Sequence, residues 1–291
     1  MDSADGLVRT TAAGRAIRAV AAVTTQLVDE ARQRHRTAPT ASAALGRTMT
    51  AGLLLGSLLR EDETISLQFV GKGQLRGIFV DANARGDVRG FVYHPRTHLP
   101  SRNGKLDVGG AVGSGTFVVM RSQPWLTTPH RSILPIVSGE IGQDVAHYLL
   151  NSEQIPSAVS LGVFVQPDES VSAAGGFVIQ AMPGAPDDLI RQLENTVAET
   201  RPVSDMVRRG AAAHDILHEV VGAFSPSAIE EQTVRFVCRC SRDRVLGALV
   251  ALGRDEVRAL LDTQGSAQVT CEFCNTRFTL ERTELEALIE G

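Results

Sequence analysis

The first 237 of the 291 residues contain no cysteine, and all four cysteines of the chain fall in its last 54 residues. A chain of this length, with 43% hydrophobic residues, can bury a core without disulfide bonds. A chain of this size therefore does not need disulfide bonds for its stability, and the thiols act together or not at all. Thiols gathered in two short-spaced pairs indicate metal ligands in a reducing compartment.

The sequence also lacks an uninterrupted apolar run near the roughly 20 residues that a membrane helix needs. The best candidates, Leu53–Leu59 and Val245–Leu252, are short and contain glycine. The N-terminal segment has no signal-peptide core, because Arg9, Arg15 and Arg18 interrupt its Ala and Val stretches. We expect a cytoplasmic protein without a membrane partner, although the composition does not exclude an organelle transit peptide.

An excess of positive charge is missing too. The formal net charge is −4, from 29 Lys and Arg against 33 Asp and Glu. Phe236–Gly291 contains seven Arg and no Lys against nine Asp and Glu. Since phosphate backbones are bound through clustered cations, we expect no nucleic-acid partner.

Alternating apolar residues predict antiparallel β-structure. Three of the runs form a predicted β-meander with a turn at Asn83–Gly86, and three later runs are expected to complete the sheet. The six predicted strands are Thr64–Val70, Leu75–Val80, Val88–Tyr93, Gly115–Met120, Ala158–Val165 and Phe177–Met182.

Helical patterns accompany these strands. The Ala- and Leu-rich run Thr40–Leu59 predicts a helix that lays one wide apolar face on the sheet. Ser138 is predicted to cap another helix that ends before Pro156. We therefore assign residues 1–185 to one α+β core domain of mixed sheet and helix.

The pattern changes at residues 183–186, which read Pro-Gly-Ala-Pro. Apolar residues then recur at helical spacing, but Pro202, Gly210 and Gly222 break the stretch. Residues 186–233 are therefore predicted to form a helical linker with little core of its own. A permanently packed amphipathic hairpin is the alternative interpretation of this periodicity.

The last segment, residues 234–291, carries the chemistry. A short strand from Val234 is expected to hold Cys238 and Cys240, and a knuckle after two short helices to hold Cys271 and Cys274. Zinc binds four thiolates tetrahedrally, and two closely spaced pairs joined by a folded loop supply that set. We predict a small C-terminal domain that binds one zinc ion through these four cysteines.

Two interpretations of this centre remain open, a permanent structural clip and a redox switch. Four flanking arginines favour reactive thiolates, whereas Asp243 and Glu272 act in the opposite direction. A module of about 55 residues is marginal without metal. Oxidation to the disulfides Cys238 with Cys240 and Cys271 with Cys274 would therefore expel the metal and unfold the module.

Two other motifs are similar to catalytic or phosphate-binding motifs but lack essential residues. His214 and His218 flank Asp215 as in a metalloprotease helix, but the catalytic Glu and a third ligand are missing, so we expect exposed or capping roles. Gly71–Gly73 lacks the Ser or Thr of a phosphate loop and predicts a turn at a strand end. We predict no catalytic residue and no enzymatic activity.

The two cysteine stretches, VRFVCRCSRDRV and CEFCNTRF, resemble the zinc domain of the heat shock protein 33 family. Residues Gln123–Pro135 depart from the family pattern, which has an aromatic-x-glycine motif there. The resemblance otherwise covers essentially the whole chain and extends to six more stretches: Glu30–His35, Ala44–Ala51, Gly86–Phe91, Gly104–Gly113, Val137–Asp144 and Ser152–Val163.

The resemblance implies a stress-response chaperone that is monomeric and inactive while its four cysteines bind zinc. In that scheme oxidation releases zinc and unfolds the tail and linker. The exposed apolar surface then binds unfolded or misfolding client proteins without ATP, as a homodimer. The residues leave two other classes open: a zinc-ribbon nucleic-acid-binding protein, which the acidic module disfavours, and a thiol-disulfide oxidoreductase using Cys271 and Cys274, whose knuckle lacks the strand-to-helix setting.

Overall fold

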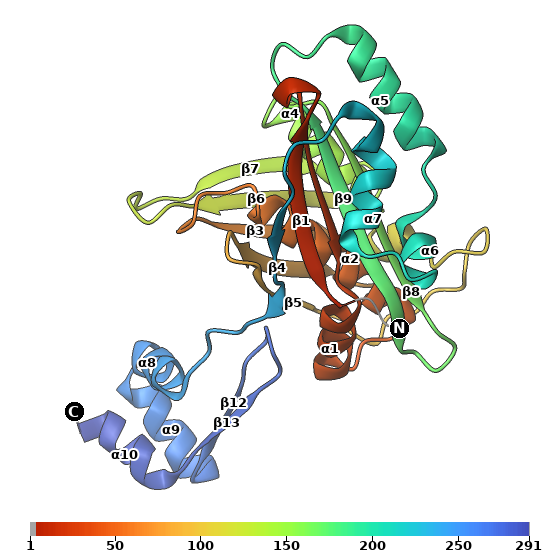
Figure 1. The fold of residues 1–291 in the computed structure, drawn as a ribbon. Coiled ribbons are helices and arrows are strands. Elements are labelled where there is room, and N and C mark those ends of the chain that lie inside the picture. The colour runs from red at the N-terminus through yellow and green to blue at the C-terminus, as the bar shows by residue number, and fades with distance from the viewer. Residues whose placement is uncertain (1–3, 291) are drawn as a thin grey trace. The chain divides into compact units, whose positions relative to one another are not determined.

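The computed structural model describes residues 4–290, and the chain forms two compact units, Met1–Val237 and Cys238–Gly291 (Figure 1). Both units combine helices and strands, as the predicted α+β class requires. The boundary between the two compact units falls just before Cys238, the first cysteine. The predicted division into three parts, with boundaries after residues 185 and 233, stays a prediction. Among the described residues, no helix combines the length and apolarity needed to cross a bilayer.

One sheet of the first unit has five antiparallel strands in the order β10-β1-β2-β9-β8. Its strands β1 and β2 were not predicted, because their short Ala- and Arg-containing runs alternate weakly. The bounds are β1 Gly6–Ala12, β2 Ile17–Val23, β8 Ser157–Val165, β9 Val171–Ala181 and β10 Glu230–Gln232.

The second sheet has six strands in the order β11-β5-β4-β3-β6-β7, and only β11 runs parallel to its neighbour. The predicted meander is confirmed in β3, β4 and β5. The bounds are β3 Thr64–Gly71, β4 Gly77–Asn83, β5 Asp87–Val92, β6 Gly115–Ser122, β7 His130–Pro135 and β11 Arg235–Phe236. The expectation that all predicted strands build a single sheet was wrong, because β8 and β9 pair with β2 in the other one.

Helix α2, Pro39–Gly56, lies between the two sheets (Figure 1). Every residue of α2 except Pro39 and Arg47 is buried, so the predicted single apolar face was wrong and the helix is enclosed all round. Small residues permit this: a Cβ at Gly46 would lie 2.5 Å from Val28 Cγ1. Glycine and alanine thus allow a helix to fit between two sheets.

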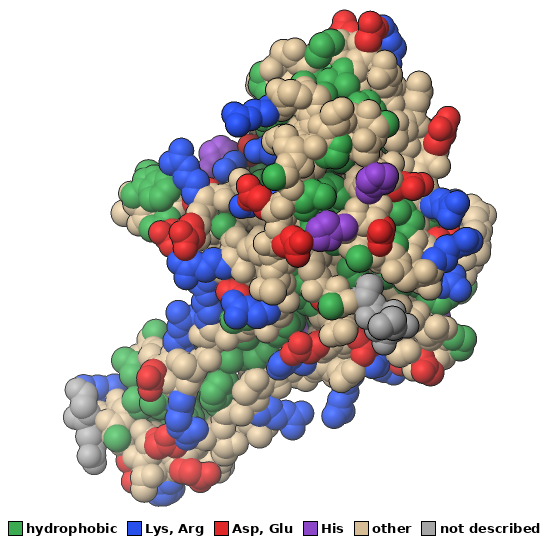
Figure 2. Space-filling model, viewed as in Figure 1, with side chains coloured by type: hydrophobic (Ala, Val, Ile, Leu, Met, Phe, Trp, Pro, Cys, Tyr) green, Lys and Arg blue, Asp and Glu red, His purple; other side chains and the backbone are tan. Residues whose placement is uncertain are grey.

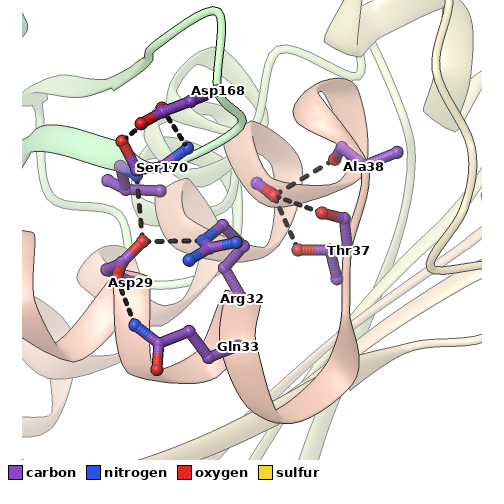
Figure 3. Close-up of polar contacts among 9 residues, drawn as sticks. Asp29, Arg32, Gln33, Thr37, Ala38, Asp168 and Ser170 are labelled. Carbon is purple, nitrogen blue, oxygen red and sulfur yellow. Dashed lines mark hydrogen bonds and ion pairs between the residues drawn. The ribbon is translucent and has the colours of Figure 1, made fainter.

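Helix α1, Thr25–His35, connects the β8–β9 turn to the rest of the unit through Asp29 (Figure 3). Asp29 Oδ1 accepts hydrogen bonds from Arg32 Nε at 2.7 Å and from the Val171 N–H at 3.0 Å. Its Oδ2 accepts from Gln33 Nε2 at 2.6 Å. One carboxylate therefore joins a helix turn to a strand that begins more than a hundred residues later.

Two short helices follow: α3 Val108–Val112 contacts β3 of the six-stranded sheet, and α4 Gly142–Asn151 contacts β8 of the five-stranded sheet. The prediction that Ser138 caps α4 was wrong, because the helix begins four residues later, after Ile141. Ser138 Oγ instead donates to Asp144 Oδ2 at 3.0 Å. Asp144 is buried, and its carboxylate accepts hydrogen bonds from this hydroxyl and from the backbone N–H groups of Val137 and Ser138.

The predicted linker forms α5 Asp187–Glu199, α6 Val203–Arg208 and α7 Ala213–Val221. Its apolar residues pack on the outer face of the five-stranded sheet, where Ile216 and Leu217 join a cluster with Ile17 and Phe177. The linker therefore shares a core with the sheet, and only α5 is thinly anchored, with Leu193 as its one buried residue. Short 3₁₀ helices span Ala13–Arg15 and Gly222–Phe224.

The second unit packs three helices on a two-stranded ribbon. Its core consists of seven buried apolar residues, among them Leu280 and Leu285, both 0% exposed. The predicted final helix is present. The bounds are α8 Arg242–Leu252, α9 Arg254–Gln264, β12 Ala267–Thr270, β13 Arg277–Leu280 and α10 Arg282–Glu290.

Candidate metal centre

The two cysteine pairs lie in two different local structures. Cys238 and Cys240 follow β11 in an irregular segment, so the prediction of a strand through both cysteines was wrong. Cys271 opens the tight turn between β12 and β13, where its N–H donates to Thr276 O at 2.9 Å. Asn275, with a φ of 59°, closes this turn by donating from its N–H to Cys271 O at 2.8 Å. The predicted knuckle is confirmed.

All four Sγ atoms lie within 4.8 Å of one another. The sulfurs of Cys238 and Cys271 are 3.7 Å apart, and those of Cys240 and Cys274 are 3.4 Å apart. A tetrahedral centre with metal–sulfur bonds of about 2.3 Å places its sulfurs about 3.8 Å apart. The four thiols therefore already have the spacing of a closed tetrahedral site and could hold one metal ion.

The acidity of the thiols is uneven. Burial raises the pKa of Cys240 and of Cys271, and neighbouring thiols add to the rise. Burial would raise the pKa of Cys274 as well, but hydrogen bonds from Thr276 outweigh it and lower this pKa to about 7. Four thiolates this close repel one another, so a divalent cation is what would keep them all deprotonated together.

Two supporting residues were missed at the sequence level. Ser241 directly follows Cys240 and caps α8, since its Oγ accepts from the Arg244 N–H at 3.3 Å. Thr276 Oγ1 lies 3.2 Å from Cys274 Sγ. Ser241 could have been predicted as a cap, because it precedes a helical pattern. The contact of Thr276 with Cys274 could not, because it depends on the geometry of the turn.

One of the arginines that flank the cysteines, Arg242, makes structural contacts. Arg242 is committed to Glu284, with Nε donating to Oε1 at 2.8 Å, and it also donates to Thr279 O at 2.8 Å. This arginine therefore ties α8 to the region of α10, and its charge is largely compensated. Of the four flanking arginines that were predicted to favour thiolates, Arg242 is therefore paired with a carboxylate.

The weaker motifs take structural roles. Asp215 caps α7 by accepting from the Ala212 N–H at 2.8 Å, and His214 Nε2 lies 3.2 Å from Glu231 Oε1. Gly71 ends β3, as the predicted strand-end turn requires. Across residues 4–290, the four cysteines are the one group of three or more His, Cys, Asp or Glu side chains placed to share a metal ion.

With this geometry established, comparison with known proteins gives a family. The model of the Hsp33 protein family matches residues 5–281. The chain belongs to the Hsp33 family. The predicted resemblance is confirmed, and with it the chaperone class, which favours neither the nucleic-acid-binding nor the oxidoreductase alternative.

Named members of the Hsp33 family are similar along their whole length. The 33 kDa chaperonin of Geobacillus kaustophilus is 42% identical over 98% of this chain and 97% of its own length. That of Staphylococcus aureus is 41% identical over 99% and 98%. The crystal structure of the 33 kDa chaperonin of Thermotoga maritima superposes with a TM-score of 0.93 at 32% identity, covering 98% of both chains.

The stretch that departs from the family pattern, Gln123–Pro135, forms the turn and the second strand of the β6–β7 hairpin. Its turn exposes Trp125 and Leu126, which are 58% and 51% accessible. Figure 2 shows hydrophobic side chains gathered at the tip of this hairpin. The departure therefore lies on an exposed turn of the first unit and includes none of the four cysteines.

Proposed function

We propose that this protein is a redox-regulated, ATP-independent holdase chaperone and not an enzyme. The observation that carries the proposal is the convergence of the only four cysteines of the chain within 4.8 Å, inside a unit of 54 residues. A domain this small depends on its metal or its cross-links for stability. The oxidation state of the four thiols would therefore decide whether the unit is folded.

The metal in this proposal is one zinc ion per chain, held by Cys238, Cys240, Cys271 and Cys274. When bound, zinc neutralises the thiolates and supplies folding free energy to the small unit. The residues fit zinc because all four donors are sulfur and their spacing is tetrahedral. Burial, which favours neutral thiols at Cys240 and Cys271, would otherwise oppose a thiolate cluster.

Peroxide is the proposed oxidant. Each pair of thiolates transfers two electrons to one hydrogen peroxide: one S–S bond forms, the O–O bond breaks, and two protons from solvent complete two water molecules. We propose that the pairs are Cys238 with Cys240 and Cys271 with Cys274. Loss of the metal ligands then unfolds the cysteine-bearing unit and releases the linker, residues 186–233, whose α5 has a single buried anchor.

The partners in this proposal are unfolded or misfolding proteins of the cytoplasm, bound by a homodimer of the oxidised form. Release of the linker would uncover apolar residues of the five-stranded sheet, such as Val8 and Phe177, which are 3% and 1% exposed in the folded state. Nucleic acid and membranes are not proposed as partners, because the net charge is −4.

The test is aggregation of a chemically denatured client followed by light scattering, with zinc release followed colorimetrically. We expect the reduced, zinc-loaded protein to leave aggregation unchanged. Peroxide treatment should release about one zinc per chain and produce a form that suppresses aggregation. If zinc is retained after peroxide treatment, or if both forms suppress aggregation equally, the centre has only a structural role.

Peptide mapping under non-reducing conditions tests the disulfide pairing. Four cysteines allow three connectivities. In the reduced centre the short contacts join Cys238 to Cys271 and Cys240 to Cys274, across the two sequence pairs. Recovery of these cross-paired disulfides would therefore contradict the proposed pairing while leaving the redox switch intact. Reduction with dithiothreitol and zinc is the control, since it should restore the inactive form.

A further inference from the structure

Arg47 is the one charged residue of the enclosed helix α2. Its Nη1 donates to Glu140 Oε2 at 2.6 Å, and its side chain is 14% exposed. The Nε of Arg47 is buried and has no hydrogen-bond partner among the described residues. A buried donor without an acceptor is destabilising, so a core helix would not carry this arginine for packing alone.

Arg47 lines a pocket of about 750 Å³ within the first unit. Four of the stretches that resemble the Hsp33 family pattern, far apart in the sequence, meet around this pocket. They are Ala44–Ala51, Gly104–Gly113, Val137–Asp144 and Ser152–Val163. All four stretches belong to the first unit, so none of them contributes a residue to the cysteine centre.

Two further cations stand at the edge of the pocket. Arg102 and Lys105 flank a tight turn, with backbone hydrogen bonds of 2.8 and 3.0 Å between them. Asn103 and Gly104, at φ values of 52° and 72°, place both flanking side chains on the pocket rim. Both cations are exposed, and neither has an ion-pair partner within the described part of the chain.

The acidic residues of the pocket are already engaged. Glu140 accepts from Arg47 and from the Gly109 N–H at 3.2 Å. Asp107 accepts from the Gly110 N–H at 2.9 Å. The three cations therefore outnumber the two carboxylates in a protein whose overall charge is negative, and the surplus faces the pocket.

We propose that this pocket binds a small phosphomonoester, as a site separate from the redox centre. Phosphate oxygens accept charge-assisted hydrogen bonds from Arg102 and Lys105, the strongest class of such bonds. The hydroxyl-bearing body of the ligand lies against Ser138, Ser160 and Gln143, which also line the pocket. The volume is in the range of about 300–1,000 Å³ that small-molecule sites occupy.

Calorimetric titration of the full-length, reduced and zinc-loaded protein tests the assignment, with ribose 5-phosphate as the probe. We expect saturable binding with a dissociation constant below about 1 mM, and none with ribose. The double variant R102Q/K105Q should bind at least about tenfold more weakly, since two charge-assisted contacts are lost. Both side chains are exposed on a turn, so the variant retains the fold.

The matched control is K72Q/R76Q, which removes the same two charges at exposed positions outside the pocket. It should bind the probe like the unmodified protein. An equal loss in both double variants would show nonspecific charge attraction and overturn the site. Absence of binding at 10 mM probe (about tenfold above the expected dissociation constant), or equal affinity for inorganic phosphate, would overturn it as well. Holdase activity and zinc release are measured separately, so failure here is distinguishable from failure of the redox proposal.

Discussion

Tyr148 shows how one buried hydroxyl can join two parts of the core. Its side chain is 2% exposed, and its hydroxyl donates to Glu153 Oε1 at 2.5 Å. Arg121 Nη1 lies 3.2 Å from the other oxygen of the same carboxylate. Burial first, and the Glu153 carboxylate second, raise the pKa of Tyr148 above its ordinary value of 10.0. The neutral hydroxyl therefore stabilises the fold fully below that ordinary value, and this contribution is lost as pH rises through the elevated pKa.

Replacing this hydroxyl is a direct test. Tyr148→Phe should lower the free energy of unfolding by about 1 kcal/mol at pH 7, because the partly buried Glu153 carboxylate loses a donor. Urea denaturation of the reduced protein measures the change. The only other tyrosine, Tyr93, is 51% exposed, so Tyr93→Phe should change stability by less than about 0.5 kcal/mol. Similar losses in the two variants would contradict the assigned role of Tyr148.

At the scale of elements, one carboxylate contributes to the connection between α1 and the start of β9. Asp29 binds two side chains of its own helix and the N–H of Val171 (Figure 3). Burial opposes ionisation, but these hydrogen bonds outweigh it and lower the pKa of Asp29. Since the folded-state pKa lies below the unfolded one, the stabilisation is complete above the ordinary value of 3.8 and is lost as pH falls through the lowered value.

Asp29→Asn should therefore destabilise the protein by about 1 kcal/mol at pH 7, since an amide oxygen replaces a charged acceptor. The difference from the unmodified protein should shrink as the pH is lowered below about 4. Urea titrations at several pH values measure it. Asp262→Asn is the control, because the side chain of this exposed residue on α9 makes no hydrogen bond or ion pair within residues 4–290. A difference that stays constant with pH would refute the electrostatic account.

The two units of the molecule differ in how much core each contains. The first unit encloses α2 between two sheets, whereas the second has seven buried apolar residues in its cluster. Small cores seldom stabilise a domain alone. The second unit is therefore expected to depend on metal, while the first does not.

Metal removal tests this difference across the whole molecule. Incubation of the reduced protein with a zinc chelator should abolish slow amide hydrogen exchange in α8–α10. Helix α2 should stay protected because it is enclosed, and within the linker α5 should exchange faster than α7, which has five buried residues. Exchange measured by mass spectrometry resolves these segments. Full protection of α8–α10 without metal would contradict metal-dependent folding.

The sequence by itself determined which residues gather at the centre. The short spacing within each cysteine pair is local information, and it indicated that Cys238, Cys240, Cys271 and Cys274 could share one metal ion. The β-meander and the linker helices were predictable for the same reason, since their periodicity is written in neighbouring residues. Family membership followed from stretches that are themselves continuous.

Only the tertiary structure decided how these parts combine. The two-sheet arrangement depends on pairing β2 with β9, more than 150 residues apart, and no local pattern encodes that choice. Enclosure of α2 depends on which sheet covers its second face, so its apolar periodicity suggested one buried side where there are two. The pocket around Arg47 required four distant stretches to meet, because a binding site assembled from separate segments exists only once the long-range contacts have formed.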